Sequence, residues 1–241
     1  MFHFKQFSIS DTRTAMKVGT DGVLLGAWAD PSGMSRIVDA GAGSGLIALM
    51  MAQRTAGVTP PVSVTAVELS TGAAADARDN VAASPWEARV EVVEGDCLTF
   101  TPKDAGAEGP LMVVSNPPFF AEALRSPDAA RALARHGDEF DVVSLIDMAA
   151  RLGASQLAFI APANRDGDVE FRLALRRFSP RRICRVATRA GRPPQRTLWQ
   201  ASSASGPAEV TDLAIRDTSG ALTPEYVALT SAFYLDNPHS L

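Results

Sequence analysis

Several residue types that mark particular protein classes are scarce in this chain. Among 241 residues there are only two cysteines, Cys97 and Cys184, and they lie far apart in the sequence, which argues against a disulfide framework or a zinc site of the CxxC type. The three histidines lack the HxxxH spacing of a metal site on one helix, so we expect no metal. No apolar run approaches the roughly 20 residues of a membrane-spanning helix, and the N-terminus lacks the apolar core of a signal peptide. We therefore expect a cytoplasmic protein.

The residues that are present suit one α/β domain. Hydrophobic residues make up 46% of the chain, which is enough for a sizeable core. From residue 36 onward, short β-branched segments such as RIVDA, VSVTAVE and LMVVS alternate with longer Ala-rich amphipathic segments. This alternation predicts a doubly wound, mostly parallel sheet, with an antiparallel hairpin of late strands at one edge. The segment TPEYVALTSAFYL predicts a final helix that begins at Pro224. We expect a single domain over residues 1–241, with an N-terminal segment (1–33) ahead of the core (34–241).

A glycine-rich segment, DAGAGSG at residues 39–45, lies between the expected strand RIVDA and the expected helix LIALMMAQR. Glycines let a backbone approach a ligand closely, so the segment is typical of a nucleotide-binding loop, although an ordinary turn can have the same composition. The dinucleotide fingerprint GxGxxG is not present, because counting from Gly41 the sixth position is Leu46. Asp39 suits a cation, such as the ammonium group of S-adenosylmethionine, better than a pyrophosphate.

Two further carboxylates stand at the ends of the next expected strands. Glu68 closes VSVTAVE, 29 residues after Asp39, and Asp96 follows RVEVVE, 28 residues after Glu68. The carboxyl ends of neighbouring parallel strands line one crevice, so the three acids would face one ligand. There Glu68 can accept both ribose hydroxyls, and Asp96 can accept from the adenine amine of the cofactor. The adenine ring would then lie between apolar neighbours such as Leu69 and Leu98. Acids also cap helices, and that alternative remains open.

A rigid turn, Asn116-Pro117-Pro118-Phe119, follows the apolar strand LMVVS. The two prolines fix the backbone and exclude a helix. Methylation of an exocyclic amine requires two acceptors that orient its hydrogens, and the Asn116 side-chain carbonyl and the Pro117 backbone carbonyl can serve. Phe119 offers a ring face on which a nucleobase can stack. A plain Asn-Pro turn is the alternative, although the position after three acidic strand ends favours catalysis.

An N-terminal block, FKQF at residues 4–7 and MKVGTDGVLLGAW at residues 16–28, precedes the first expected parallel strand. The segment FHFKQFSIS at residues 2–10 predicts a small β element, and Thr20 or Asp21 can cap a helix through DGVLLGAWA at residues 21–29. On composition alone, this block is equally consistent with a lid that serves packing only. Together with the glycine loop and the NPPF turn, it resembles the class I S-adenosylmethionine-dependent methyltransferases, and within them the bacterial valine-tRNA (adenine-37 N6)-methyltransferase family. Further similarity lies in segments 45–50, 84–86, 115–120, 134–136 and 233–235.

The resemblance implies a seven-stranded, mostly parallel sheet with an antiparallel edge strand and a small N-terminal extension. It implies S-adenosylmethionine as cofactor, tRNA as substrate, and a segment 1–33 that covers the methionine end of the cofactor. The catalytic set is then Asn116, Pro117, Pro118 and Phe119. The cofactor-binding set is Lys17, Thr20, Asp21, Asp39, Gly41, Gly43, Gly45, Glu68, Leu69, Asp96, Cys97 and Asn116. The chain has Phe119 where family members often carry Tyr, and residues 195–198 match loosely.

The charge distribution is uneven. The formal net charge is -4, which argues weakly against nucleic-acid binding. However, residues 176–196 contain eight arginines and no acidic residue. Such a stretch can engage RNA phosphates despite an acidic whole, and a solvated basic face is the alternative.

Three functions remain open at this point. The first is methylation of the N6 amine of adenine in tRNA, which the N-terminal block and the NPPF turn favour. The second is methylation of another planar nitrogen, such as a protein glutamine amide or another RNA or DNA base. The third is a non-catalytic or NAD-type binding module, which Leu46 and Asn116 both disfavour.

Overall fold

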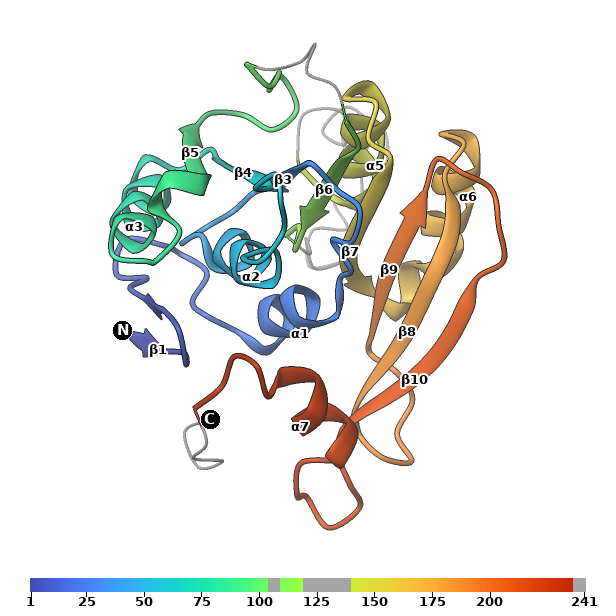
Figure 1. Ribbon diagram of the computed structural model, residues 1–241. Coiled ribbons are helices and arrows are strands. Elements are labelled where there is room, and N and C mark those ends of the chain that lie inside the picture. The colour runs from blue at the N-terminus through green and yellow to red at the C-terminus, as the bar shows by residue number, and fades with distance from the viewer. Residues whose placement is uncertain (104–108, 119–139, 236–241) are drawn as a thin grey trace, which may run out of the picture.

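The computed structural model describes residues 1–103, 109–118 and 140–235 of the chain. Eight of the described strands form one sheet with helices on both faces (Figure 1). Neighbouring strands are parallel except for β9, which is antiparallel to both of its neighbours. The expected doubly wound, mostly parallel α/β fold is therefore confirmed. In spatial order the strands are β10 (Glu209–Arg216), β8 (Ser179–Arg189), β9 (Arg196–Ser202), β7 (Gln156–Pro162), β6 (Leu111–Ser115), β3 (Arg36–Ala40), β4 (Ser63–Glu68) and β5 (Val90–Glu94).

The edge of the sheet differs in detail from the expectation. The sheet has eight strands rather than seven, and the antiparallel strand β9 lies inside it, between β7 and β8, rather than at its edge. The burial pattern gives the reason: residues 197–201 of β9 are buried on both faces, which an edge position would not allow. The outer strand is β10, whose first four residues are exposed, as is usual at an edge.

Two layers of helices bury the two faces of the sheet. The first layer contains α1 (Thr20–Trp28), α2 (Leu46–Arg54), α3 (Thr71–Ala82) and α7 (Pro224–Thr230), and the second contains α5 (Val142–Arg151) and α6 (Asp166–Leu175). Every residue of β6 is buried, and its side chains alternate between the layers: Met112 and Val114 pack with the first, Leu111 and Val113 with the second. Central strands buried on both faces need the continuous apolar runs seen in the sequence. Two short 3-10 helices, η1 (Glu87–Arg89) and η3 (Ala163–Arg165), lie in connections.

Helix α1 packs directly on α2. Its residues 22–28 are all buried, because α2 lies on one side of it while α7 and β7 contact it elsewhere. A Cβ atom on Gly26 would overlap the Met50 side chain of α2, so glycine permits this close approach. Since α2 begins directly after the glycine loop, the position of α1 bears on the loop.

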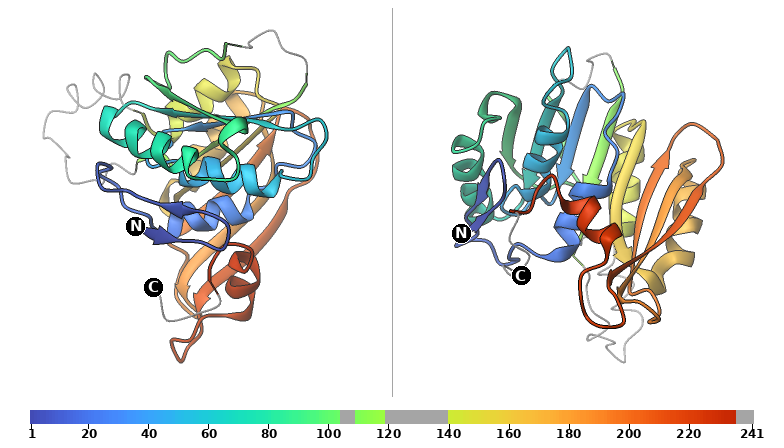
Figure 2. Two further views of the ribbon diagram at one scale, coloured as in Figure 1. Left: turned by 60° about the vertical axis from the view of Figure 1, so that its left-hand side comes forward. Right: turned by 60° about the horizontal axis from the view of Figure 1, so that its bottom comes forward.

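The two ends of the described chain meet. The strands β1 (Phe2–His3) and β2 (Ser8–Ile9) form a small antiparallel hairpin, as expected. The Lys5 amide donates to the Phe233 carbonyl at 2.8 Å, and the rings of Phe4 and Tyr234 are 5.9 Å apart. Figures 1 and 2 show both termini on the same side of the molecule. The N-terminal hairpin thus shares its hydrophobic cluster with α1 and α2.

The helix boundaries follow from local capping. Helix α7 starts at Pro224, as expected, after Thr223, whose hydroxyl accepts from the Tyr226 amide at 3.3 Å. The expectation that Thr20 or Asp21 caps α1 was wrong: the N-cap is Gly19, and no side chain accepts a capping bond. None of the helices in the described ranges has the length and apolarity needed to cross a bilayer.

Candidate active site

The glycine loop joins the end of β3 to the start of α2. Its three glycines, Gly41, Gly43 and Gly45, have φ values of +69°, +56° and +84°, a region that other residues rarely adopt. The Gly41 amide donates to the Val67 carbonyl at the end of β4 at 2.9 Å. A Cβ atom on Gly41 would stand 2.9 Å from the Phe140 ring. The loop therefore needs glycine for its backbone conformation, and at Gly41 also because a side chain would collide with the Phe140 ring.

Asp39 lies under this loop with no exposed surface. Its Oδ2 accepts from the Ala48 amide of α2 at 2.9 Å, whereas its Oδ1 has no hydrogen-bond partner in the structure. Burial raises the pKa of the Asp39 carboxyl to about 7, with the nearby Glu68 charge adding to the shift and the Ala48 hydrogen bond opposing it. A buried carboxyl with one free oxygen fits a cationic partner that the chain itself does not supply.

Glu68 ends β4 beside the glycine loop. Its Oε2 accepts from the Gly43 amide at 2.8 Å, and its Oε1 accepts from the Ser70 amide at 2.8 Å. Each carboxylate oxygen has a further lone pair, so the group can still accept from a ligand hydroxyl. The next residue, Leu69, is 68% exposed, which leaves an apolar side chain open beside the carboxylate.

Asp96 and Cys97 lie in the turn after β5. The Asp96 Oδ1 accepts from the Leu98 amide at 2.8 Å, and the Cys97 Sγ accepts from the Gly41 amide at 3.2 Å. Burial raises the pKa of the Cys97 thiol to about 12, so it is neutral and packs as an apolar group. This turn is thereby tied to the glycine loop.

The NPP segment follows β6, between β3 and β7. The Ser115 hydroxyl donates to the Ala40 carbonyl at 2.6 Å, which fixes the end of β6 against the start of the glycine loop. The Asn116 Oδ1 is buried and has no hydrogen-bond partner, and Pro117 is buried. Phe119 lies outside the described residues. An unpartnered buried amide oxygen here fits a donor on a bound substrate.

The N-terminal residues reach the site through α3. The Asn80 side chain bridges two segments, because its Nδ2 donates to the carbonyls of Ser10 at 2.8 Å and Ser44 at 2.9 Å. The buried Asp76 carboxylate accepts from the Thr14 amide and hydroxyl, both at 2.8 Å. These bonds hold segment 10–14 beside the glycine loop, where a Cβ atom on Gly43 would lie 3.8 Å from the Thr14 methyl.

The remaining predicted cofactor residues lie farther along this segment. The Lys17 Nζ donates to the Thr14 carbonyl at 3.1 Å, so the ammonium group binds within the segment that carries it. Thr20 is exposed at the start of α1. The Asp21 carboxylate pairs with Arg196, 3.0 Å from Oδ2 to Nε. Both Lys17 and Asp21 thus have protein partners in this structure.

The structure brings most of the predicted residues to one end of the sheet, where the parallel strands have their carboxyl ends. Asp39, Glu68, Asp96 and Asn116 stand at or just beyond the carboxyl ends of four adjacent strands, in the spatial order β6, β3, β4, β5. No group of histidine, cysteine, aspartate or glutamate suited to a metal ion occurs within the described ranges. This edge therefore offers acidic and amide acceptors around a glycine-rich loop.

Sequence reasoning missed residues that hold the site in place. Arg151 of α5 donates to the carbonyls of Cys97 at 3.3 Å, Leu98 at 3.0 Å and Phe100 at 2.9 Å, and so fixes the turn that carries Asp96. Asp76 and Asn80 fix segment 10–14 in a comparable way. Nothing in the local sequence marks them, although Asp76 and Asn80 share a helix face at the i, i+4 spacing.

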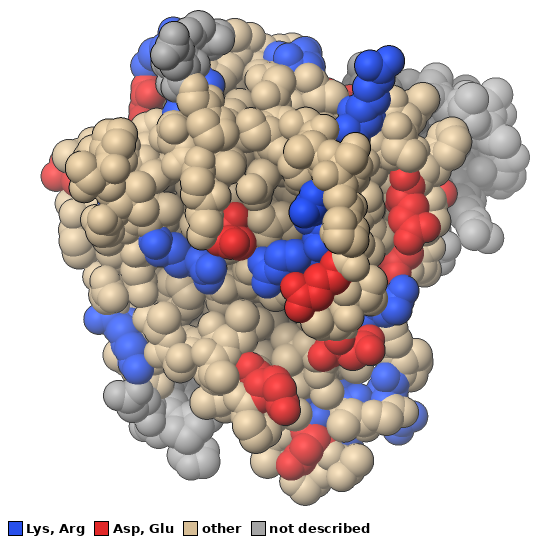
Figure 3. Space-filling model, turned by 45° about the vertical axis from the view of Figure 1, so that its right-hand side comes forward, with Lys and Arg blue, Asp and Glu red and all other residues tan. Residues whose placement is uncertain are grey.

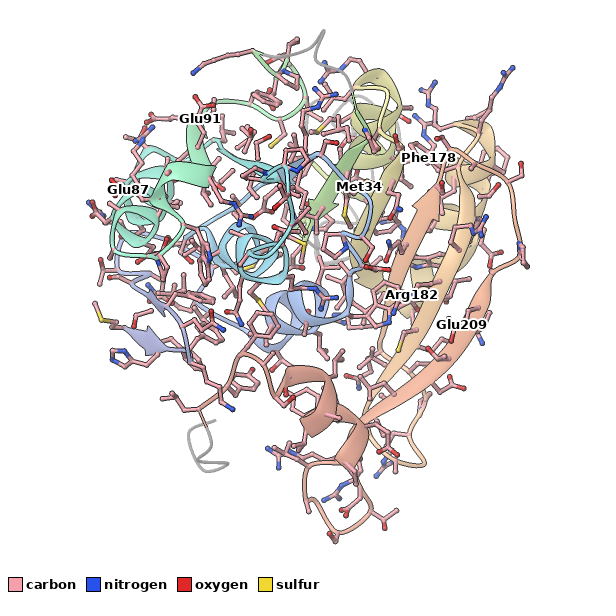
Figure 4. All side chains as sticks on the ribbon, viewed as in Figure 1. Met34, Glu87, Glu91, Phe178, Arg182 and Glu209 are labelled. Carbon is pink, nitrogen blue, oxygen red and sulfur yellow. The ribbon has the colours of Figure 1, made fainter. Side chains whose placement is uncertain are left out.

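The arginine stretch 176–196 does not form one surface. It begins at the end of α6, follows the 11 residues of β8 and ends at the start of β9, and at ~3.3 Å per residue β8 spans about 35 Å. Figure 4 shows Phe178 at the start of β8 and Arg182 part of the way along it. Four of the eight arginines bind other parts of the protein: Arg176 binds Asp147 at 2.8 Å, Arg181 the Ser205 carbonyl at 3.0 Å, Arg182 the Trp28 carbonyl at 3.0 Å, and Arg196 Asp21 at 3.0 Å.

Comparisons with known proteins identify the fold. Residues 17–140 match the family model described as the methyltransferase small domain. A solved structure from Agrobacterium tumefaciens, named as a predicted O-methyltransferase, is 25% identical with a TM-score of 0.62 and covers 88% of this chain and 96% of its own. The human methyltransferase 10 domain-containing protein, 16% identical with a TM-score of 0.52, covers 82% of this chain and 90% of its own. The protein has the class I methyltransferase fold.

A curated relative shows the family. The tRNA1(Val) (adenine(37)-N6)-methyltransferase of Tolumonas auensis is 40% identical over 236 residues, which are 97% of this chain and 96% of the relative. The expected resemblance is thereby confirmed at nearly full length. By its sequence similarity over nearly the full length, the chain belongs to the tRNA1(Val) (adenine(37)-N6)-methyltransferase family.

Proposed function

We propose that this protein transfers a methyl group from S-adenosylmethionine to the N6 amine of an adenine in tRNA, the anticodon-loop adenine 37 of a valine tRNA. Family membership at 40% identity over 97% of the chain supports the reaction and the substrate. The structural observation that carries the proposal is the Asn116 Oδ1, which is buried, unpartnered and placed at the carboxyl edge of the sheet beside the glycine loop.

The residues of the site fit the cofactor. When bound, S-adenosylmethionine supplies an electrophilic methyl group on a sulfonium centre. The free Oδ1 of Asp39 would accept the ammonium group, and Glu68 would accept the ribose hydroxyls with lone pairs that Gly43 and Ser70 leave unused. Leu69, open to solvent, would cover one face of the adenine ring.

Further cofactor contacts come from the turn after β5 and from the N-terminus. Asp96 and Cys97 would line the adenine edge, in a turn fixed by Arg151. Lys17, Thr20 and Asp21 belong to segment 1–33, which we propose covers the methionine end. The bonds of Asn80 to Ser10 and Ser44 support this arrangement.

Asn116 and Pro117 would orient the substrate amine. The nitrogen lone pair of an exocyclic amine is delocalised into the ring, so the amine must be drawn toward tetrahedral geometry before it attacks. The side-chain carbonyl of Asn116 and the backbone carbonyl of Pro117 would each accept one amine hydrogen, and Phe119 would stack on the flipped base. Asparagine is not a strong base, so the rate would come from positioning and fixed dipoles.

The substrate also sets the location and the charge requirements of the protein. A tRNA-modifying enzyme acts in the cytoplasm, and we propose that location here. We further propose that the later arginines of the stretch 176–196, toward the end of β8, contact tRNA phosphates.

One experiment tests the proposed reaction. The purified protein is incubated with S-adenosylmethionine and unmodified valine tRNA, and the RNA is digested to nucleosides for mass spectrometry. We expect one N6-methyladenosine per tRNA, and none in a matched transcript with guanosine at position 37. Methyl label that enters polypeptide but not tRNA would favour the glutamine-amide alternative and contradict the proposal.

A further inference from the structure

Three arginines share the end of the strands β8 and β10. Arg189 ends β8, and Arg216, which ends β10, is its direct partner in the register of the two strands. Arg192 lies in the connection from β8 to β9. All three side chains are exposed, and none forms an ion pair with a carboxylate in the described part of the chain. The Arg216 Nη1 donates to the Gly220 carbonyl at 2.8 Å, which leaves its other guanidinium donors available. We name this group the arginine tip (Arg189, Arg192 and Arg216).

The arginine tip projects beyond the candidate active site, on the same edge of the sheet. The register aligns Ser115 of β6 with Phe159 of β7, Trp199 of β9 and Ile183 of β8. Because β8 runs in the same direction as β6 and β7, its last residues extend past the strand end that carries Asn116. Arg189 comes six residues after Ile183, a distance of ~20 Å at about 3.3 Å per residue. Figure 1 shows the ends of β8 and β10 reaching past the central strands.

Most other arginines of the stretch 176–196 lie elsewhere or are engaged by other parts of the protein. Arg176 and Arg181 lie near the opposite end of β8 and bind Asp147 and the Ser205 carbonyl. Arg185 has Asp212 of β10 as its register partner. Arg182 and Arg196 hold α1.

The acidic residue next to the tip, Asp217, does not cancel its charge. Asp217 follows Arg216, but its carboxylate accepts from the amides of Ser219 and Gly220, each at 2.8 Å, within its own turn. Basic and acidic side chains are interspersed on the face shown in Figure 3, so the position of each arginine matters more than the total charge. The three guanidinium groups against the one carboxylate of Asp217 leave the tip positive.

We infer that the arginine tip binds the phosphate backbone of the RNA whose base enters the site. This inference rests on the proposed function. A nucleic-acid strand carries a negative charge every ~3.4 Å, so an RNA leaving the site passes roughly six phosphates over ~20 Å. Guanidinium forks match phosphate geometry and stay charged at every physiological pH. Arg216 lies outside the basic stretch of the sequence and joins the surface only through the pairing of β8 with β10.

A pair of matched triple variants tests the inference. The tip variant carries Arg189→Gln, Arg192→Gln and Arg216→Gln, and the control carries Arg176→Gln, Arg177→Gln and Arg181→Gln. Both lose three positive charges. Binding of unmodified valine tRNA is measured across a range of salt concentrations, and binding of S-adenosylmethionine is measured by calorimetry without RNA.

In the tip variant, we expect the log-log salt slope to fall by about two to three units, because each phosphate contact contributes roughly 0.7–0.9. Its tRNA affinity at low salt should fall at least tenfold. Its affinity for S-adenosylmethionine, measured by calorimetry, should equal that of the parental protein. The control should keep the parental slope. The single variant Arg192→Glu, in a connection outside the sheet, should weaken tRNA binding in the same direction without disturbing the fold.

Three outcomes would overturn the inference. The first is a parental salt slope in the tip variant, and the second is an equal loss of tRNA affinity in the control variant. In both cases the proposed function stands as long as the parental protein methylates tRNA. If the parental protein binds and methylates no tRNA, the proposed function fails and the inference falls with it.

Discussion

Asp21 and Arg196 join the first turn of α1 to the first residue of β9. The Asp21 Oδ2 lies 3.0 Å from the Arg196 Nε, and the side chains are 29% and 34% exposed. At the other end of α1, the Arg182 guanidinium donates to the Trp28 carbonyl at 3.0 Å and lies 4.3 Å over its ring. The β8–β9 hairpin therefore holds α1 at both ends, and α1 in turn packs on the helix that follows the glycine loop.

This pair should act as a unit. Asp21→Asn and Arg196→Gln should each lower the free energy of unfolding by about 0.5–1 kcal/mol, since the pair is half-buried and partly screened. The double variant should lose no more than either single one, because one interaction is removed only once. Urea denaturation of the four proteins measures this coupling. Asp168→Asn, in the exposed pair with Arg165, is the control and should change little; additive losses at Asp21 and Arg196 would show that the pair is not coupled.

Glu68 should be required for cofactor affinity. Glu68→Ala removes the proposed acceptor for the ribose hydroxyls and also leaves the Gly43 amide without its partner, so binding should weaken by on the order of 1–3 kcal/mol. Glu94→Ala, at the end of the next strand, is a matched control because its carboxylate binds Thr71 and Arg78 instead. Calorimetry that gives parental affinity for Glu68→Ala would remove this residue from the site.

Asp39 should make stability depend on pH when no cofactor is bound. Its folded-state pKa of about 7 lies above the ordinary value of 3.8, so between these pH values the folded protein keeps a proton that the unfolded chain releases. The free energy of unfolding should therefore fall as pH rises through this window, by roughly 1.4 kcal/mol per unit, and level off above it. In urea denaturation, the free energy of unfolding of Asp39→Asn should rise relative to that of the parental protein as pH rises through the window. A difference that does not change with pH would contradict the raised pKa.

The sequence predicted which residues of the candidate site would come together where local patterns encode them. The glycine loop, the strand-end acids Glu68 and Asp96, and the NPP turn each follow from residues adjacent in the chain, and the strand order of the fold gathers them. The partners of Asp21 and Asp76 could not be predicted this way, because Arg196 and Thr14 are distant in sequence and meet them only after the sheet and α3 have packed.

The arginine stretch shows that residues close together in the sequence need not form one surface. Eight neighbours in the sequence suggest one basic surface, but an extended strand separates its ends, and adjacent side chains point to opposite faces. The interior position of β9 was also missed, since the segments for β8 and β9 read as consecutive edge strands, and only the addition of β10 covers β8.

Gly41 should tolerate no side chain. Its φ of +69° disfavours other residues, and an added Cβ would stand 2.9 Å from the Phe140 ring, so Gly41→Ala should destabilise the fold by about 1–2 kcal/mol and reduce cofactor affinity. Gly57→Ala, where no atom lies within 4 Å of the new Cβ, is the control. Thermal unfolding and calorimetry of both variants test this, and equal stability of the two would show that the loop can relax.

The most direct test of the proposed chemistry is the single-turnover rate of Asn116→Ala with saturating cofactor and tRNA. The buried Oδ1 of Asn116 is assigned to orient the amine as the new bond forms, so the variant should keep its fold and cofactor affinity but transfer methyl groups about 10²–10³-fold more slowly at every RNA concentration. Asn164→Ala, which changes an exposed asparagine after β7, should react at the parental rate. A parental rate for Asn116→Ala would contradict the assignment of the NPP turn to amine methylation.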